Sequence, residues 1–154
     1  MSALATLLIW LVLGTASAQD PRGRMADPRP DSLEGLVRDL AGSDRSRRTF
    51  AIRELNRIAR ISRKHEFGPL TSEATIDALQ NLEFLDQHAA NVCIQHLRLD
   101  VEVRGCARLL GYLETAAGKT ALQAARTRTD RKATIRRIDR TLAILAAENE
   151  ESTP

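Results

Sequence analysis

The sequence predicts an all-α fold built as a stack of antiparallel helix pairs. Apolar residues recur along the chain at the helical spacing of three and four, whereas clusters with the alternation of a strand do not occur. The segments between these periodic stretches are only a few residues long, a length typical of helices that pack side by side. Both observations favour a single helical domain over residues 32–147.

The first expected helix begins at a capping box and ends at a glycine. Asp31 and Glu34 have the spacing of that box, and apolar residues from Leu33 to Ala41 follow on one stripe. Gly42 is the residue type that most readily takes a left-handed conformation, so we expect the helix to stop there.

Six further helices are expected, which makes seven in all: 44–64, 72–83, 87–98, 101–115, 119–126 and 131–147. Asp44 caps the first of these, and Gly68 and Pro69 follow its end. Asp86 is the expected restart between 72–83 and 87–98. No Gly or Pro separates those two segments, so one bent helix is the alternative there.

Residues 1–18 have the order of a secretory signal peptide. An apolar run from Leu4 to Leu13 precedes the triplet Ala16-Ser17-Ala18, the type of site after which such peptides are cut. Fifteen helical residues rise only about 22 Å, less than the roughly 30 Å of a hydrocarbon core, so a permanent anchor is disfavoured. The protein is therefore expected to be periplasmic or secreted, or cytoplasmic if translation starts at Met25.

The remaining composition is mildly basic and poor in aromatic residues. All 23 Lys and Arg and all 20 Asp and Glu follow residue 18, so cleavage leaves the net charge of +3 unchanged. This excess is small for a dedicated nucleic-acid binder, and 3% aromatic residues disfavour base stacking. Proline-rich residues 19–31 are predicted to be a flexible linker, and 148–154 a disordered acidic tail.

An internal repeat relates two of the expected helix pairs through the pattern D-x3-R-x2-A. Its two copies begin at Asp44 and Asp100, and Asp130 stands in the same place before the last helix. The third copy departs from the pattern, with Thr134 at the Arg position and Arg137 at the Ala position.

This pattern resembles the HEAT-like repeat family, whose units each stack two helices. The resemblance implies a short right-handed α-solenoid, in which the turn Asp and the following Arg tie neighbouring repeats together. It assigns that structural role to Asp44, Arg48, Asp100, Arg104 and Asp130. An ordinary helical bundle is the alternative.

Eight basic residues on three of the longer helices are candidate partner-binding side chains: Arg53, Arg57, Arg60, Lys64, Arg104, Arg108, Arg136 and Arg140. Their spacing places each group on one face of its helix. If these helices line up, the rows merge into a surface for another protein with an acidic face. The alternative is a solvated charged surface that neighbours such as Glu54 and Asp139 partly neutralise.

No enzymatic activity, metal or cofactor is expected. Gly118-Lys119-Thr120 lacks the earlier glycine of a phosphate-binding loop, because Leu113 stands there. His88 and His96 are about 12 Å apart along a helix, too far to share a metal. The expected function is a non-catalytic protein–protein interaction module. The alternative is a binder of an anionic polymer, either nucleic acid or an anionic envelope surface.

Cys93 and Cys106 are equally distant from the turn between Leu99 and Asp100. A helical hairpin folded there places the two side chains opposite one another. In an oxidising compartment one outcome is a disulfide, worth about 3 kcal/mol. The other is a pair of buried free thiols.

Overall fold

The computed structural model describes residues 32–151, with the side chains of 32–147. The predicted signal peptide and linker, residues 1–31, lie outside the described residues. In the described part every regular element is an α-helix, and there are six: α1 (Leu33–Ala41), α2 (Arg45–His65), α3 (Glu73–Arg98), α4 (Val103–Leu113), α5 (Ala116–Arg128) and α6 (Lys132–Glu151). The predicted helical class is confirmed.

The predicted count of seven helices is wrong, because 72–83 and 87–98 form the single helix α3. Leu85, at the expected break, is fully buried and continues the apolar stripe between the two halves. Asp86 stays exposed within the helix and does not restart it. With neither Gly nor Pro in this stretch, no residue interrupts the backbone hydrogen bonds.

The caps at the two ends of α1 differ in part from the expectation. Ser32 is its N-cap and accepts a hydrogen bond from the Gly35 amide at 3.1 Å, whereas Asp31 lies outside the described residues. The helix ends before Gly42 as predicted, but Gly42 has a φ of −70°, so the left-handed conformation predicted there is wrong. The Arg48 guanidinium donates to the carbonyl oxygens of Gly42 and Ser43, which satisfies the end of the helix in another way.

Of the later helices, α2 begins at its predicted cap, whereas α5 and α6 have ends that differ from the prediction. Asp44 caps α2 as predicted, since its carboxylate accepts from the Arg47 amide at 2.8 Å. Thr115 caps α5 through the Gly118 amide at 2.9 Å, so this helix begins three residues before the predicted Lys119. At the other end, α6 continues to Glu151, through four residues that the sequence assigned to the disordered tail.

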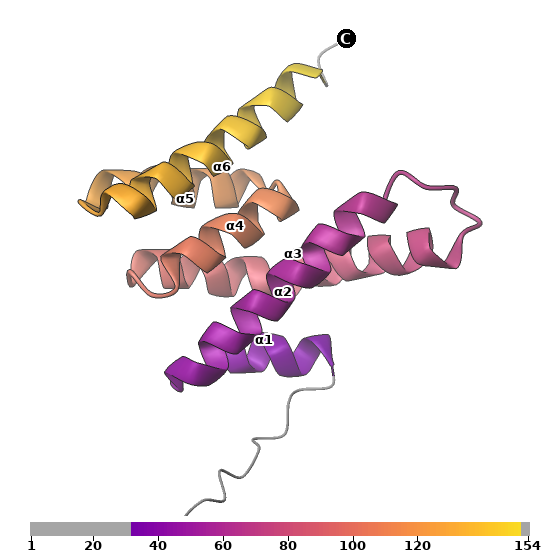
Figure 1. Cartoon of the computed structure of the whole chain (residues 1–154), viewed down its shortest axis with the longest axis horizontal. Coiled ribbons are helices and arrows are strands. Elements are labelled where there is room, and N and C mark those ends of the chain that lie inside the picture. The colour runs from indigo at the N-terminus through magenta and orange to yellow at the C-terminus, as the bar shows by residue number, and fades with distance from the viewer. Residues whose placement is uncertain (1–31, 152–154) are drawn as a thin grey trace, which may run out of the picture.

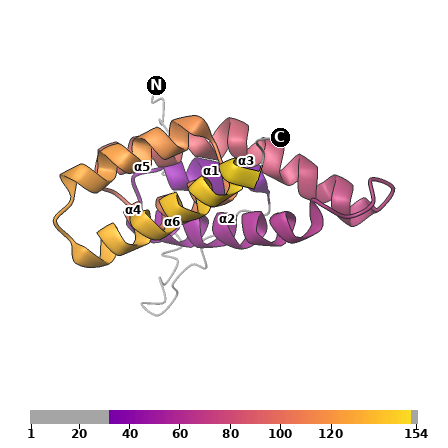
Figure 2. The ribbon, with the colours of Figure 1, turned by 90° about the horizontal axis from the view of Figure 1, so that it is seen from above.

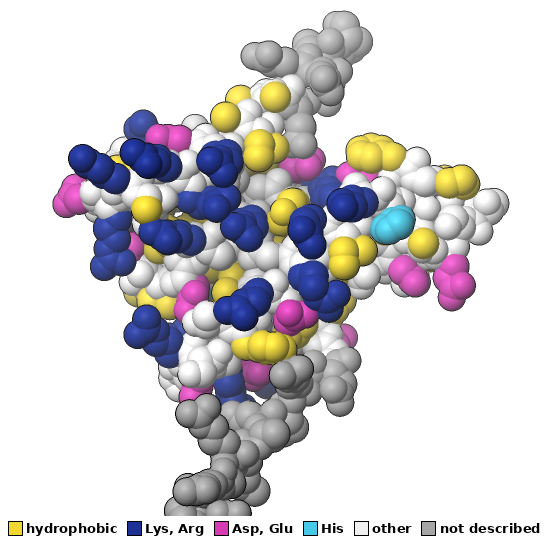
Figure 3. Space-filling model, viewed as in Figure 1, with side chains coloured by type: hydrophobic (Ala, Val, Ile, Leu, Met, Phe, Trp, Pro, Cys, Tyr) yellow, Lys and Arg dark blue, Asp and Glu magenta, His cyan; other side chains and the backbone are white. Residues whose placement is uncertain are grey.

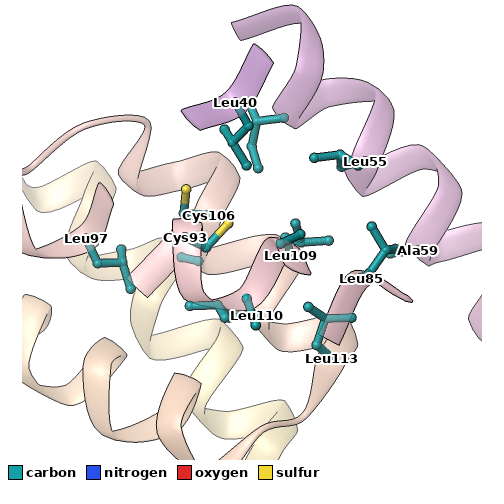
Figure 4. Close-up of a cluster of buried hydrophobic side chains, with 14 of the residues drawn as sticks. Leu40, Leu55, Ala59, Leu85, Cys93, Leu97, Cys106, Leu109, Leu110 and Leu113 are labelled. Atoms are coloured by element: carbon teal, nitrogen blue, oxygen red, sulfur yellow. The ribbon is translucent and has the colours of Figure 1, made fainter. Parts of the chain in front are cut away.

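The six helices form two layers, with α1, α3 and α5 in one and α2, α4 and α6 in the other (Figures 1 and 2). Consecutive helices run in opposite directions, and α4 lies between α2 and α6. The core fills the space between the layers, where Leu40, Leu55, Leu85 and Leu109 are fully buried (Figure 4). Burial of these leucines is the main favourable term in the stability of the fold.

Two glycines allow α4 to approach both of its neighbours in the second layer. A Cβ at Gly105 would lie 2.5 Å from Cγ1 of Ile52 on α2. A Cβ at Gly111 would lie 2.7 Å from Cγ2 of Thr141 on α6. Both distances are far below van der Waals contact, so the spacing of α2, α4 and α6 depends on the missing side chains.

Candidate binding surface

The eight predicted basic residues are all exposed, on α2, α4 and α6. Because these helices form one layer, their outward sides make a continuous surface, which we call the basic face. Lys and Arg side chains gather on the side of the molecule where this layer lies (Figure 3). The expected alignment of the three helices is therefore present in the fold.

The centre of the basic face is a cluster of four arginines from α4 and α6. Burial lowers the pKa of Arg137, and the positive charges of Arg108, Arg140 and Arg104 lower it further. Within residues 32–147, Arg108, Arg137 and Arg140 form no ion pair with a carboxylate. This like charge is thus not neutralised by described residues of the chain.

Only part of the predicted neutralisation is present. Arg57 pairs with Glu54 at 2.8 Å, as the alternative reading of the surface requires. Asp139 instead pairs with Arg126 on α5 and leaves the arginine cluster uncompensated. Arg136 is exposed on α6 but is not among the charges that act on Arg137.

A groove of about 570 Å³ opens beside this cluster, between α4, α6 and the end of α2. We call it the arginine groove. Its lining includes the three arginines without an ion pair, which are Arg108, Arg137 and Arg140. Three bulky apolar or aromatic side chains share the lining: Phe67, Tyr112 and Ile144. Phe67 lies just after α2 and is 89% exposed. The groove thus places positive charge next to accessible apolar surface.

Arg63 has a different role in the same groove, because its charge is satisfied. Its Nη1 lies 2.6 Å from Glu66 and its Nη2 lies 2.8 Å from Glu114. Its Nε donates to the Tyr112 carbonyl at 2.5 Å, which ties α2 to α4. Arg63 therefore holds the wall of the groove together.

Of the residues that line the arginine groove, only Arg108 and Arg140 were predicted from the sequence. Arg137 entered only as a departure from the repeat, although its spacing of three from Arg140 indicates a shared face of α6. Tyr112 lies on the helix of Arg108, four residues further on, which is the same kind of signal. No sequence signal places Phe67 there, because it follows the end of α2.

The repeat positions lie at the helix junctions, and the hydrogen bonds of Asp44 and Arg48 are local to the start of α2. Asp100 takes a left-handed φ of 56° in the turn before α4, Arg104 belongs to the basic cluster, and Asp130 is exposed before α6.

Three other residues join α2 to α4. Thr49 donates to Glu102 at 2.8 Å, Asn56 donates to the Gly105 carbonyl at 3.0 Å, and Arg63 donates as described above.

Cys93 and Cys106 meet in the core between α3 and α4, as the hairpin predicts (Figure 4). They are free thiols in the structure, and their position across the hairpin leaves the disulfide a prediction for the protein in an oxidising compartment. The hydrogen bond between them raises the pKa of Cys93 well above its usual value, and burial adds to this shift. The same hydrogen bond lowers the pKa of Cys106 to about 7, against the effect of burial and with help from His96.

His96 is a core residue, as expected, with 8% of its surface exposed. Its Nδ1 atom is buried and has no hydrogen-bond partner among the described residues. The part of the chain that the structure describes contains no group of three or more His, Cys, Asp or Glu side chains placed to hold a metal ion. The two thiols and the imidazole are thus a buried polar cluster.

No protein-family model, curated protein or solved structure matches this chain. Among the described helices, none combines the length and the apolar character that crossing a bilayer requires.

Proposed function

We propose that this protein is an exported, non-catalytic interaction module whose basic face binds an acidic surface of another protein. The observation that carries the proposal is the cluster of Arg104, Arg108, Arg137 and Arg140, whose mutual repulsion an anionic partner would relieve. Folding does not require such a cluster, because exposed charges contribute little to stability.

We further propose that the two layers are a short right-handed α-solenoid of HEAT-like pairs. Two features support this proposal. The helices form three successive pairs, α1–α2, α3–α4 and α5–α6, and an Asp precedes the second helix of each pair. Solenoids commonly bind partners along an extended face made by equivalent helices of successive repeats. The α2, α4 and α6 layer is such a face.

The proposal is tested by photo-crosslinking in native extracts. A photoreactive amino acid replaces Lys64 on the basic face, or Gln123 on α5 as the matched control. We expect one acidic protein to crosslink at position 64 and not at 123, and the Arg108→Glu, Arg140→Glu variant to lose that product. Equal crosslinking at both positions would contradict the proposal, and so would a variant that still forms the product.

A binder of an anionic polymer remains the second candidate, because the arginine cluster has no carboxylate partner among the described residues. The affinity for nucleic acid falls steeply as salt rises, because about one counterion is released for each phosphate contact. A mixed oligonucleotide and vesicles rich in phosphatidylglycerol are the probes for this candidate. Tight, salt-steep binding of either probe, with no acidic protein captured, would favour it over the protein partner.

The proposed export is supported by the apolar run before Ala16-Ser17-Ala18. We predict that the native mature chain begins at Gln19, which the intact mass of protein purified from its own cells would measure. A chain beginning at Met25 would place the protein in the cytosol, and a chain that retains Met1 would contradict cleavage.

A further inference from the structure

The arginine groove carries more information than the rest of the basic face, because it combines charge with accessible apolar side chains. Phe67 is 89% exposed and Ile144 49% exposed, and both line the same groove as Arg108 and Arg140. The alternative of a solvated charged surface does not account for an exposed phenyl ring beside the arginines. Water contact with these side chains costs free energy that an apolar group from a partner would recover.

The charged side of the groove suits carboxylates. Arg137 is partly buried among three other guanidinium groups, and Arg108 and Arg140 flank it without an ion pair to any described carboxylate. Guanidinium groups bind carboxylates through paired hydrogen bonds, so several neighbouring arginines can take several acidic side chains.

The walls of the groove are held in place before any partner arrives. The bonds of Arg63 to Glu66, Glu114 and the Tyr112 carbonyl fix the α2 side against α4. The close approach of Gly111 to Thr141 fixes α4 against α6. A preformed groove reduces the entropy lost on binding.

We infer that the arginine groove takes a peptide segment in which an apolar side chain stands between acidic side chains. The apolar side chain packs against Phe67, Tyr112 and Ile144, and the carboxylates bind the arginines. The charge of the groove requires an acidic occupant, and the accessible Phe67 and Ile144 favour one that also carries an apolar side chain over a purely charged polymer. The inference rests on the proposed function and names the chemistry of its partner.

The test uses fluorescence anisotropy with labelled synthetic peptides and the mature chain. One peptide repeats Glu-Glu-Leu, the second repeats Glu-Glu-Ser, and an oligothymidylate of similar charge is the third probe. We expect the leucine peptide to bind about tenfold more tightly than the serine peptide, because half-burying a leucine has about that effect. The Phe67→Ala variant should lose this preference and keep its affinity for the serine peptide.

The controls separate failure of the groove from failure of the basic face. Equal affinity for both peptides would overturn the inference while leaving an acidic partner for the basic face. Absence of binding to either peptide, or tighter binding of the oligothymidylate, would overturn both. Arg98→Gln on α3 is the matched charge control and should change no affinity, and circular dichroism verifies that each variant is folded.

Discussion

The two helical layers cover the same core but differ on their outward sides. In the α2, α4 and α6 layer, Arg108, Arg137 and Arg140 gather without a carboxylate partner among the described residues. In the other layer, α5 satisfies two of its arginines: Arg126 pairs with Asp139, and Arg128 donates to the Leu97 carbonyl at 3.0 Å. Arg108, Arg137 and Arg140 differ from these arginines because they lie close enough to repel one another and line one groove. This clustering, more than the lack of a partner at any one residue, makes them the better candidates for binding.

The largest expected effect is loss of binding when the basic face is reversed in charge. Arg108→Glu with Arg140→Glu should weaken binding of the Glu-Glu-Leu peptide about a hundredfold, since two attractive charges become repulsive. Fluorescence anisotropy measures the change. Arg38→Glu with Arg98→Glu changes the net charge equally on α1 and α3 and should have little effect. Comparable losses in both variants would mean that net charge alone drives binding.

The spacing of the functional layer gives the second prediction. Gly105→Ala places a methyl group where Ile52 stands, so we expect the free energy of unfolding to fall by about 1–3 kcal/mol. Urea denaturation measures this loss. The added Ile52→Ala substitution should recover part of it by making room. A Gly105→Ala variant as stable as the parent would show that α2 and α4 can separate freely.

The sequence was sufficient for features that depend on neighbouring residues. The apolar stripe on α1 and the cap at Asp44 depend only on nearby residues, and both are present in the structure. The continuous α3 was only the alternative to two helices, because the burial of Leu85 depends on packing between layers. Gly42 ends α1 as predicted but takes an extended conformation, in which its carbonyl accepts a hydrogen bond from Arg48, six residues further on.

The candidate site was predictable only in part, because it combines three helices that are distant in the sequence. Spacing along each helix identified Arg108 and Arg140. Their meeting with Arg137 depends on how closely α4 and α6 approach, which Gly111 permits. A helical pattern places a residue on a face of its own helix but does not fix its neighbours across the layer.

Arg137 gives the third prediction, in which binding and stability change in opposite directions. Arg137→Gln removes a partly buried charge that three guanidinium groups repel, so stability should rise by less than about 1 kcal/mol. Affinity for the acidic peptide should fall severalfold. Arg126→Gln is the control on the other layer: it breaks the pair with Asp139 and should leave affinity unchanged. Urea denaturation and anisotropy on the same preparations measure both quantities, and a loss of stability in Arg137→Gln would assign that residue a structural role.

The smallest expected effect lies in the core, where Cys93 and Cys106 join the two layers. In the reduced protein, the ultraviolet absorbance of thiolate should show one ionisation near pH 7 from Cys106, while Cys93 stays protonated beyond its ordinary value of 9.0. Between these pH values the folded chain binds fewer protons than the unfolded chain, so stability should rise with pH and fall as pH drops through about 7.

The variant Cys93→Ala isolates the cause of this titration. It removes the hydrogen bond that contributes most to the low pKa of Cys106, so the ionisation should move to higher pH and the rise in stability should shrink. Cys106→Ala should abolish the step near pH 7 altogether. If both thiols of the parent protein ionise together near pH 9, they do not interact across the α3–α4 interface. The opposing layers would then be joined there by packing of two small apolar side chains alone.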